Sequence, residues 1–154
     1  MLVDLERNDL GKICRHGSVR VVKPLVIEKY SHVQHIVSYI RGDAKKNITP
    51  FEILKAMFPG GTITGCPKIR AIQIIDEVED FPRGAYCGSA GWIAGGKPPN
   101  DMEFNILIRT IIKTPGTFEF FAGSGIVADS KPSREFDETR HKAMAMARSL
   151  GIDV

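Results

Sequence analysis

A glycine-rich segment contains the residue types that point most directly to chemistry. Residues 58–68 read FPGGTITGCPK, so three glycines, Thr62 and a second threonine precede a helix start. Glycines let a backbone approach a ligand closely, and the free N–H groups of a helix N-terminus favour an anion. A nucleotide-phosphate loop is disfavoured, because that motif needs Gly-Lys-Ser/Thr where this chain has Gly65-Cys66-Pro67. An anion or carboxylate site and a purely structural glycine turn both stay open.

Two glutamates and a lysine near the C-terminus form a second candidate. Glu135, Glu138 and Lys142 are spaced i, i+3 and i+7, which places them on one stripe of a helix, beside its apolar face. Two carboxylates suit Mg²⁺, which keeps waters and substrate oxygens as its other ligands. Lys142 could hold a substrate carboxylate as a point charge. The alternative interpretation is an ordinary solvated Glu–Lys helix face.

Five further residues have a functional and a structural interpretation each. Arg109 ends a predicted strand with an apolar face, so it needs either a carboxylate ligand or a buried acid. Tyr86 fits the same site or an ordinary core. Gly123 and Gly125 interrupt a strand pattern, which marks a bulge or a close approach by a ligand. His35 lies on an apolar strand, where a satisfied core histidine is the commoner case.

The elements that must position these residues alternate between strand and helix patterns. We expect strands over 19–28, 33–40, 85–93, 102–112 and 117–127, and helices over 50–57, 67–78 and 137–150. Thr49, Pro50 and Glu52 form a capping signature for the first helix, and the second should be well buried. Residues 1–5 read as the interior of a strand. The pattern predicts an α+β fold with a largely antiparallel sheet and helices packed on it.

Composition excludes several classes of protein. The chain has 154 residues, of which 43% are hydrophobic and 25% charged, as in soluble globular domains. The net charge of +3 is mild and the basic residues are scattered, so we expect no nucleic-acid partner. We see no membrane-spanning stretch and no secretory signal, and the three cysteines lack metal-ligand spacing. A cytoplasmic protein without a membrane partner is the expectation.

Seven segments together resemble the chorismate-binding enzyme family. That family includes the component I subunits of anthranilate synthase and aminodeoxychorismate synthase, and the isochorismate and salicylate synthases. The segments occur in the family's order: MLVDLERNDLG (1–11), YSHVQHIVS (30–38), FPGGTITGCPK (58–68), RGAYCG (83–88), FNILIRT (104–110), GSGIVADS (123–130) and EFDETRHKA (135–143). The resemblance implies that residues 1–154 form the C-terminal portion of the chorismate-binding fold, with the N-terminal half absent.

The resemblance implies a metal and a ring-binding role for four residues. Glu138 and Glu135 would lie at a Mg²⁺ ion, with Glu138 as the direct ligand. The ion would bind the ring carboxylate of chorismate and help the C4 hydroxyl to leave. His35 and Thr62 would lie near the ring and serve catalysis.

The resemblance also implies how the second carboxylate of chorismate is held. Tyr86, Arg109, Lys142 and the backbone N–H groups of Gly123 and Gly125 would bind the enolpyruvyl carboxylate. Chorismate is a dianion, and two cations, a metal site and loop amides are electrostatically suited to it.

Within the family, the segment Pro59-Gly60-Gly61-Thr62 resembles aminodeoxychorismate synthase component I, a para-aminobenzoate and folate pathway enzyme, because anthranilate synthases more often have alanine after the proline. Anthranilate synthase component I, of tryptophan biosynthesis, is the alternative. Either would receive ammonia from a glutamine amidotransferase partner.

The family has a further Mg²⁺-binding glutamate and a lysine upstream of the segment that starts at Met1. We therefore expect an incomplete, inactive fragment that self-associates through exposed sheet edges.

Overall fold

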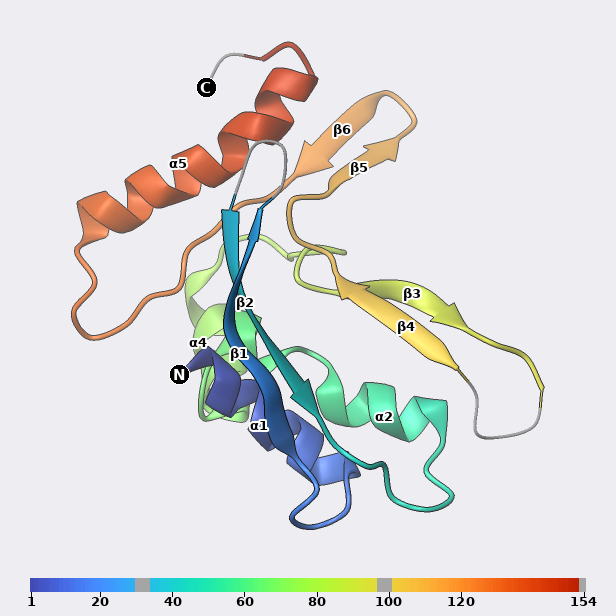
Figure 1. Cartoon of the computed structure of the whole chain (residues 1–154). Helices are drawn as coiled ribbons and strands as arrows, with labels where there is room; N and C mark the ends of the chain where they lie inside the picture. Colours follow the sequence, from blue (N-terminus) through green and yellow to red (C-terminus); the bar gives the residue numbers. More distant parts are fainter. Residues whose placement is uncertain (30–33, 97–100, 153–154) are drawn as a thin grey trace. The chain divides into compact units, whose positions relative to one another are not determined.

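The computed structural model describes residues 1–29, 34–96 and 101–152, and it combines helices with pairs of strands (Figure 1). The predicted α+β class with antiparallel strands is confirmed. In chain order the elements are α1 (Leu2–Ile13), β1 (Arg20–Lys29), β2 (Gln34–Arg41), α2 (Pro50–Met57), α3 (Gly61–Thr64), α4 (Lys68–Val78), β3 (Ser89–Ile93), β4 (Met102–Ile106), β5 (Ile111–Thr114), β6 (Thr117–Phe120) and α5 (Pro132–Ser149).

The chain divides into two compact units, which are described separately here. Unit 1 comprises residues 1–80 and 91–104, and unit 2 comprises residues 81–90 and 105–154. Within the described ranges the strands form three separate two-stranded sheets, β1–β2, β3–β4 and β5–β6. The predicted antiparallel pairing therefore holds for neighbours along the chain, without a larger sheet in that part.

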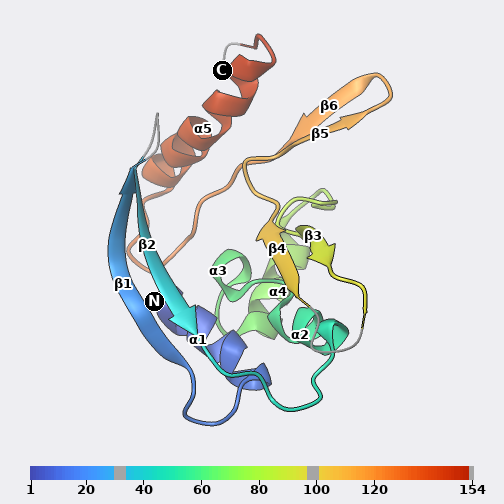
Figure 2. The ribbon, with the colours of Figure 1, turned by 45° about the vertical axis from the view of Figure 1, so that its right-hand side comes forward.

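The first segment of unit 1 is a helix, so the prediction of a strand over residues 1–5 was wrong. Over twelve residues Leu2, Leu5, Asp9 and Ile13 recur at three- and four-residue intervals, which is the helical period. A window of five residues is too short to show that period. Helix α1 contacts α2, α3 and β2 (Figure 2). Asp9 and Ile13 are its buried residues.

The two strands predicted over 19–28 and 33–40 are confirmed as β1 and β2, apart from Val33, which lies outside the described residues. The two strands are antiparallel, and His35 lies opposite Glu28. The register shifts twice between Val21 and Val26, around Pro24, which cannot donate a ladder hydrogen bond. Leu25 follows with a positive φ of 50°.

Helix α2 matches its prediction at both ends. The Thr49 side chain accepts a hydrogen bond from the Glu52 N–H, and the Glu52 carboxylate accepts from the Thr49 N–H, which completes the capping box.

Helix α4 also lies where predicted, but it is not well buried. None of its residues is buried, and Ile69 and Val78 are 75% and 71% exposed. Apolar spacing identifies a face that favours burial, and it does not show whether anything covers that face.

Strands β3 to β6 are shorter than their sequence patterns. The predicted strand over 85–93 begins only at Ser89, because Gly84–Cys87 form a turn in which the Tyr86 N–H donates to the Arg83 carbonyl. The predicted strand over 102–112 is interrupted between β4 and β5, where Arg109 has a φ of 52°. The predicted strand over 117–127 ends at Phe120, before the Gly123-Ser124-Gly125 segment.

Helix α5 starts five residues before the predicted helix. Pro132 occupies its first turn, a position that suits proline because the N–H there has no helical partner. Its buried residues are Met146 and Ala147. In the described part of the chain, no helix combines the length and apolar character needed to cross a bilayer.

Candidate functional site

Lys142 on α5 connects the helix to the glycine segment of unit 2. Its ammonium lies 2.6 Å from a Glu138 carboxylate oxygen, one turn earlier on α5, and donates to the Gly123 carbonyl at 3.1 Å. An ammonium has three protons, so these two contacts leave one donor for a ligand. The predicted Glu138–Lys142 stripe is therefore built into the protein and faces the glycine segment.

Tyr86 approaches the same glycine segment from the turn at residues 84–87. A Cβ atom added to Gly123 would lie 3.0 Å from the Tyr86 hydroxyl oxygen, so only glycine gives this hydroxyl its present room. The Tyr86 ring stacks on Phe121 with centroids 5.6 Å apart, and the Arg83 guanidinium lies 5.8 Å from the Tyr86 ring centroid. The structure thus brings Tyr86, Gly123 and Lys142 together.

Glu135 lies in the first turn of α5 and accepts a hydrogen bond from the Ser124 hydroxyl at 2.7 Å. That bond, a second one from Ser130 and the charge of Lys142 hold the pKa of Glu135 below its usual value. A negative charge in this turn also suits the positive end of the helix dipole. A pocket of about 360 Å³ adjoins Glu135, lined by Ser124, Ile126, Ser130, Pro132, Phe136 and Thr139.

The two glutamates are the part of this cluster that could hold a metal ion. Glu135 and Glu138 are three residues apart on α5, and both carboxylates are at least partly accessible. No group of three metal-binding side chains occurs among the described residues. A pair of carboxylates fits Mg²⁺, because Mg²⁺ usually takes one or two carboxylates and completes its shell with water and substrate oxygens.

Arg109 and Gly125 are not joined to this cluster by a contact in the described part of the chain. Arg109 was expected on an apolar strand face, but it is exposed in the turn between β4 and β5. It forms no hydrogen bond or ion pair with the described residues, so it does not need the buried acid that the sequence suggested. A Cβ added at Gly125 would meet open space.

His35 and Thr62 belong to unit 1. His35 is half-buried in β2. Thr62 is half-buried in α3, the single turn formed by the predicted glycine-rich loop. The Thr64 hydroxyl donates to the Gly60 carbonyl at 3.0 Å, whereas the described residues offer no hydrogen-bond partner to the Thr62 hydroxyl.

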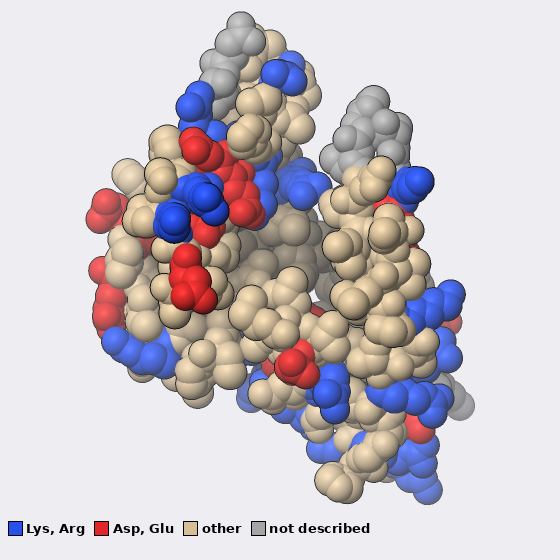
Figure 3. Space-filling view, turned by 60° about the vertical axis from the view of Figure 1, so that its left-hand side comes forward, with Lys and Arg blue, Asp and Glu red and all other residues tan. Residues whose placement is uncertain are grey.

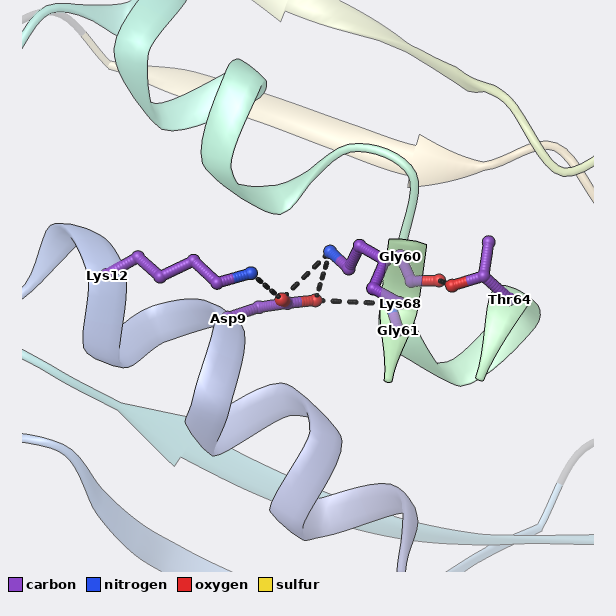
Figure 4. Close-up of polar contacts among 6 residues, drawn as sticks. All are labelled: Asp9, Lys12, Gly60, Gly61, Thr64 and Lys68. Atoms are coloured by element: carbon purple, nitrogen blue, oxygen red, sulfur yellow. Dashed lines mark hydrogen bonds and ion pairs between the residues drawn. The ribbon is translucent and has the colours of Figure 1, made fainter. Parts of the chain in front are cut away.

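The sequence interpretation missed Asp9, the buried carboxylate that the glycine-rich loop binds (Figure 4). Asp9 is 2% exposed and accepts from the Gly61 N–H at 3.1 Å and from Lys68 at 2.9 Å. Lys12 donates to the other carboxylate oxygen at 2.8 Å. The carboxylate that the loop and Lys68 bind in the structure is the protein's own, and a ligand carboxylate at this loop stays a prediction. The sequence did contain one signal for this role, because Asp9 is a charged residue that falls among the regularly spaced apolar residues of α1.

These features define a class: a mixed α+β protein whose last helix presents a lysine and two glutamates beside a glycine segment. A model of the family described as chorismate binding enzyme matches residues 1–148. The chain belongs to the chorismate-binding enzyme family.

The relatives identify different members of this family. The chain is 51% identical over 152 residues to aminodeoxychorismate synthase component 1 of Bacillus subtilis (strain 168), covering 99% of this chain and 32% of that protein. It is 47% identical over 154 residues to anthranilate synthase component 1 of Spirochaeta aurantia, covering 100% of this chain and 31% of that protein. The chain therefore spans about a third of the length of the curated relatives it matches.

Two solved structures have a similar fold. Anthranilate synthase component I from Streptococcus pneumoniae TIGR4 superposes with a TM-score of 0.79 at 38% identity, covering 95% of this chain and 33% of that one. A Bacillus anthracis protein assigned as a 2,3-dihydroxybenzoate-specific isochorismate synthase, DhbC, gives 0.81 at 26% identity, covering 99% and 40%.

Proposed function

We propose that this chain is the C-terminal portion of an aminodeoxychorismate synthase component I, which aminates chorismate. The observation that carries the proposal is the 51% identity, over almost the whole chain, to the Bacillus subtilis protein of that name. The Gly60-Gly61 pair supports the same assignment. The activity requires the rest of such a protein, so the chain alone is expected to be inactive.

In this proposal the cluster of unit 2 recognises the enolpyruvyl carboxylate of chorismate. The Lys142 ammonium supplies a charge and one remaining donor, and the Tyr86 hydroxyl lies against Gly123, beside the proposed amide donors. Charge-assisted hydrogen bonds to a carboxylate are among the stronger polar contacts, so these groups can fix the orientation of the substrate. Arg109 and the Gly125 N–H remain proposed partners of the same carboxylate.

Glu138 and Glu135 would hold Mg²⁺, which when bound supplies positive charge to the ring carboxylate and to the departing C4 hydroxyl. The Lys142 ammonium pairs with Glu138, and the Ser124 hydroxyl donates to Glu135 and orients its carboxylate. His35 and Thr62 remain predictions for the chemistry at the ring. Ammonia would come from a glutamine amidotransferase partner, in the cytoplasm.

Anthranilate synthase component I is the second candidate, because the Spirochaeta aurantia protein of that name is nearly as similar, at 47% identity. The backbone at Gly60 does not separate the two. Its φ of −57° and ψ of 135° are accessible to alanine as well, so the backbone conformation does not require glycine at this position.

A pair of chimeras tests the assignment. This chain replaces the matching C-terminal third of the Bacillus subtilis aminodeoxychorismate synthase component and, separately, of the Spirochaeta aurantia anthranilate synthase component. Each chimera is given chorismate, ammonia and Mg²⁺, and the products are separated by chromatography. The proposal predicts aminodeoxychorismate from the first chimera and little turnover from the second. Activity in the second chimera alone would favour the anthranilate synthase assignment.

A further inference from the structure

The Asp9 carboxylate connects three elements of unit 1 that are far apart in the sequence. It lies on α1, accepts the N–H of Gly61 at the start of α3, and pairs with Lys68 in the first turn of α4 (Figure 4). The Lys68 ammonium contacts both carboxylate oxygens, at 2.8 and 2.9 Å. Asp9 and Gly61 are both buried, and the Lys68 side chain is 18% exposed, so these contacts are largely shielded from water.

The turn held by Asp9 also has hydrogen bonds of its own. The N–H groups of Ile63 and Thr64 and the Thr64 hydroxyl all donate to the Gly60 carbonyl. The turn is therefore a small rigid body, and its orientation depends on how it is fixed to its neighbours. Gly61 supplies a fixing point, because a Cβ there would lie 3.2 Å from the Asp9 carboxylate and 3.4 Å from the Leu5 Cβ.

Thr62 follows Gly61 directly and has the hydroxyl of this turn that the described residues leave without a hydrogen-bond partner. Because the residue before it is bound to Asp9, the direction of the Thr62 side chain is set by a carboxylate that does not touch it. We propose that Asp9, through Gly61 and Lys68, is a positioning residue that fixes Thr62 for its contact with substrate. The contact of Thr62 with chorismate rests on the proposed function, whereas the fixing of the turn does not.

The two lysines at Asp9 have different consequences, which gives a matched control. Lys68 belongs to α4, so its ion pair ties a second element to the carboxylate. Lys12 lies three residues after Asp9 on α1 itself, so its ion pair holds no other element. The variants Lys68→Met and Lys12→Met each remove one cation from the same carboxylate, and only the first removes an attachment of the segment that follows the turn.

The test measures hydrogen exchange of the Gly61, Thr62 and Ile63 amides by NMR in the wild-type chain and in Asp9→Asn, Lys68→Met and Lys12→Met. We expect the exchange of these amides to accelerate about tenfold or more in the first two variants, since hydrogen bonds to charged groups are the ones removed. Lys12→Met should change it by about twofold at most. The Ile53 amide of α2, which donates to the Thr49 carbonyl within unit 1, reports general destabilisation of that unit, and it should accelerate much less than the amides of the turn.

Equal acceleration at the Ile53 amide and at the turn would show a merely structural Asp9 and overturn the inference, as would unchanged exchange in both Asp9→Asn and Lys68→Met. If Asp9→Asn does not fold, the comparison of Lys68→Met with Lys12→Met decides alone. Chorismate with Mg²⁺ is then added to Bacillus subtilis chimeras that contain this chain with the same substitutions, while the Thr62 amide is observed. A Thr62 shift in the wild type and in Lys12→Met, weakened in Lys68→Met, supports both proposals. No shift in any protein, with the exchange result intact, would count against the proposed function only.

Discussion

Glu135 shows at the level of a single residue how the site controls a charge. Its pKa lies below the usual value, first because the Ser124 hydroxyl donates to it and then because Ser130 and Lys142 act in the same direction. A carboxylate that stays ionised in this way is ready for a metal ion without first losing a proton. Ser124 therefore acts on the charge of this cluster through its hydrogen bond to Glu135.

Removing the Ser124 hydroxyl should raise the pKa of Glu135, because the carboxylate loses its strongest hydrogen-bond donor. The variant is Ser124→Ala, and the measurement is a ¹³C NMR titration of the glutamate side-chain carboxyl carbons. Ser149→Ala is the control, since the Ser149 hydroxyl donates to the Met146 carbonyl. An unchanged Glu135 titration in Ser124→Ala would contradict the assigned cause.

Asp9 links a buried charge to stability in acid. Burial alone would raise the pKa of Asp9, but hydrogen bonds from Lys12, Lys68 and the Gly61 N–H outweigh it and hold the pKa below the ordinary 3.8. The folded carboxyl thus binds a proton less readily than the unfolded one. Its contribution to stability is present above about pH 4 and is lost as the pH falls through the lowered value.

We expect Asp9→Asn to lower the free energy of unfolding by about 1–3 kcal/mol at neutral pH, because charged hydrogen bonds to two lysines are lost. The difference from wild type should shrink as the pH falls below 3.8 and through the lowered pKa of Asp9, where the wild-type carboxyl becomes protonated. Urea unfolding at pH 7 and pH 3 measures both. A constant difference at the two values would show that the ionised carboxyl is not the cause.

Local signals in the sequence determined some elements and left others open. Thr49, Pro50 and Glu52 fix the start of α2 through contacts within four residues, so the prediction was correct to the residue. Helix α1 and strands β3 to β6 depend on parts of the chain outside the short windows in which their patterns were assessed. The strand pattern at 102–112 continues through Arg109, but a left-handed backbone there breaks it, and no residue type announces that turn.

The candidate site was predictable to a similar degree. The stripe of Glu135, Glu138 and Lys142 follows from helical spacing, and the structure keeps it together. The role of Asp9 depends on contacts with residues 52 and 59 positions away, so no local pattern could reveal it. Arg109 was misread because its strand was taken to be longer than it is.

The capping box makes a prediction about α2 as an element. Thr49→Ala should destabilise the protein by about 1 kcal/mol, since the N–H of Glu52 loses its acceptor and the Thr49 side chain no longer closes the box. Thr49→Ser keeps a hydroxyl at the cap and should stay within about 0.5 kcal/mol of wild type. Thermal unfolding followed by circular dichroism compares the two, and equal losses would contradict the capping role.

At the scale of the whole chain, the protein exposes much apolar surface. Leu25, Ile36, Ile69, Phe81 and Ile126 are each more than 70% exposed, whereas few side chains in the described ranges are buried. In the space-filling view charged side chains of both signs are interspersed, with wide uncharged areas between them (Figure 3). Surfaces of this kind commonly mediate association.

We therefore expect the isolated chain to self-associate as its concentration rises. Multi-angle light scattering over a range of concentrations measures the mass. Ile36→Lys places a charge on the exposed side of β2. It should reduce the association, because a charged side chain on an exposed strand opposes pairing with the strand of another chain. A monomer of 17.0 kDa at every concentration would contradict the expectation.

We propose that Lys142, held between Glu138 and the Gly123 carbonyl, recognises chorismate. The most direct test is kcat/KM for chorismate in the Bacillus subtilis chimera that contains this chain, with Lys142→Met compared with Lys113→Met. Lys113 is an exposed lysine of β5 that interacts with Phe118 and lies outside the cluster. We predict that Lys142→Met lowers kcat/KM by about tenfold or more, since a charge-assisted contact is removed. Lys113→Met should leave kcat/KM unchanged. Equal kcat/KM values for the two variants would contradict a role of Lys142 in chorismate recognition.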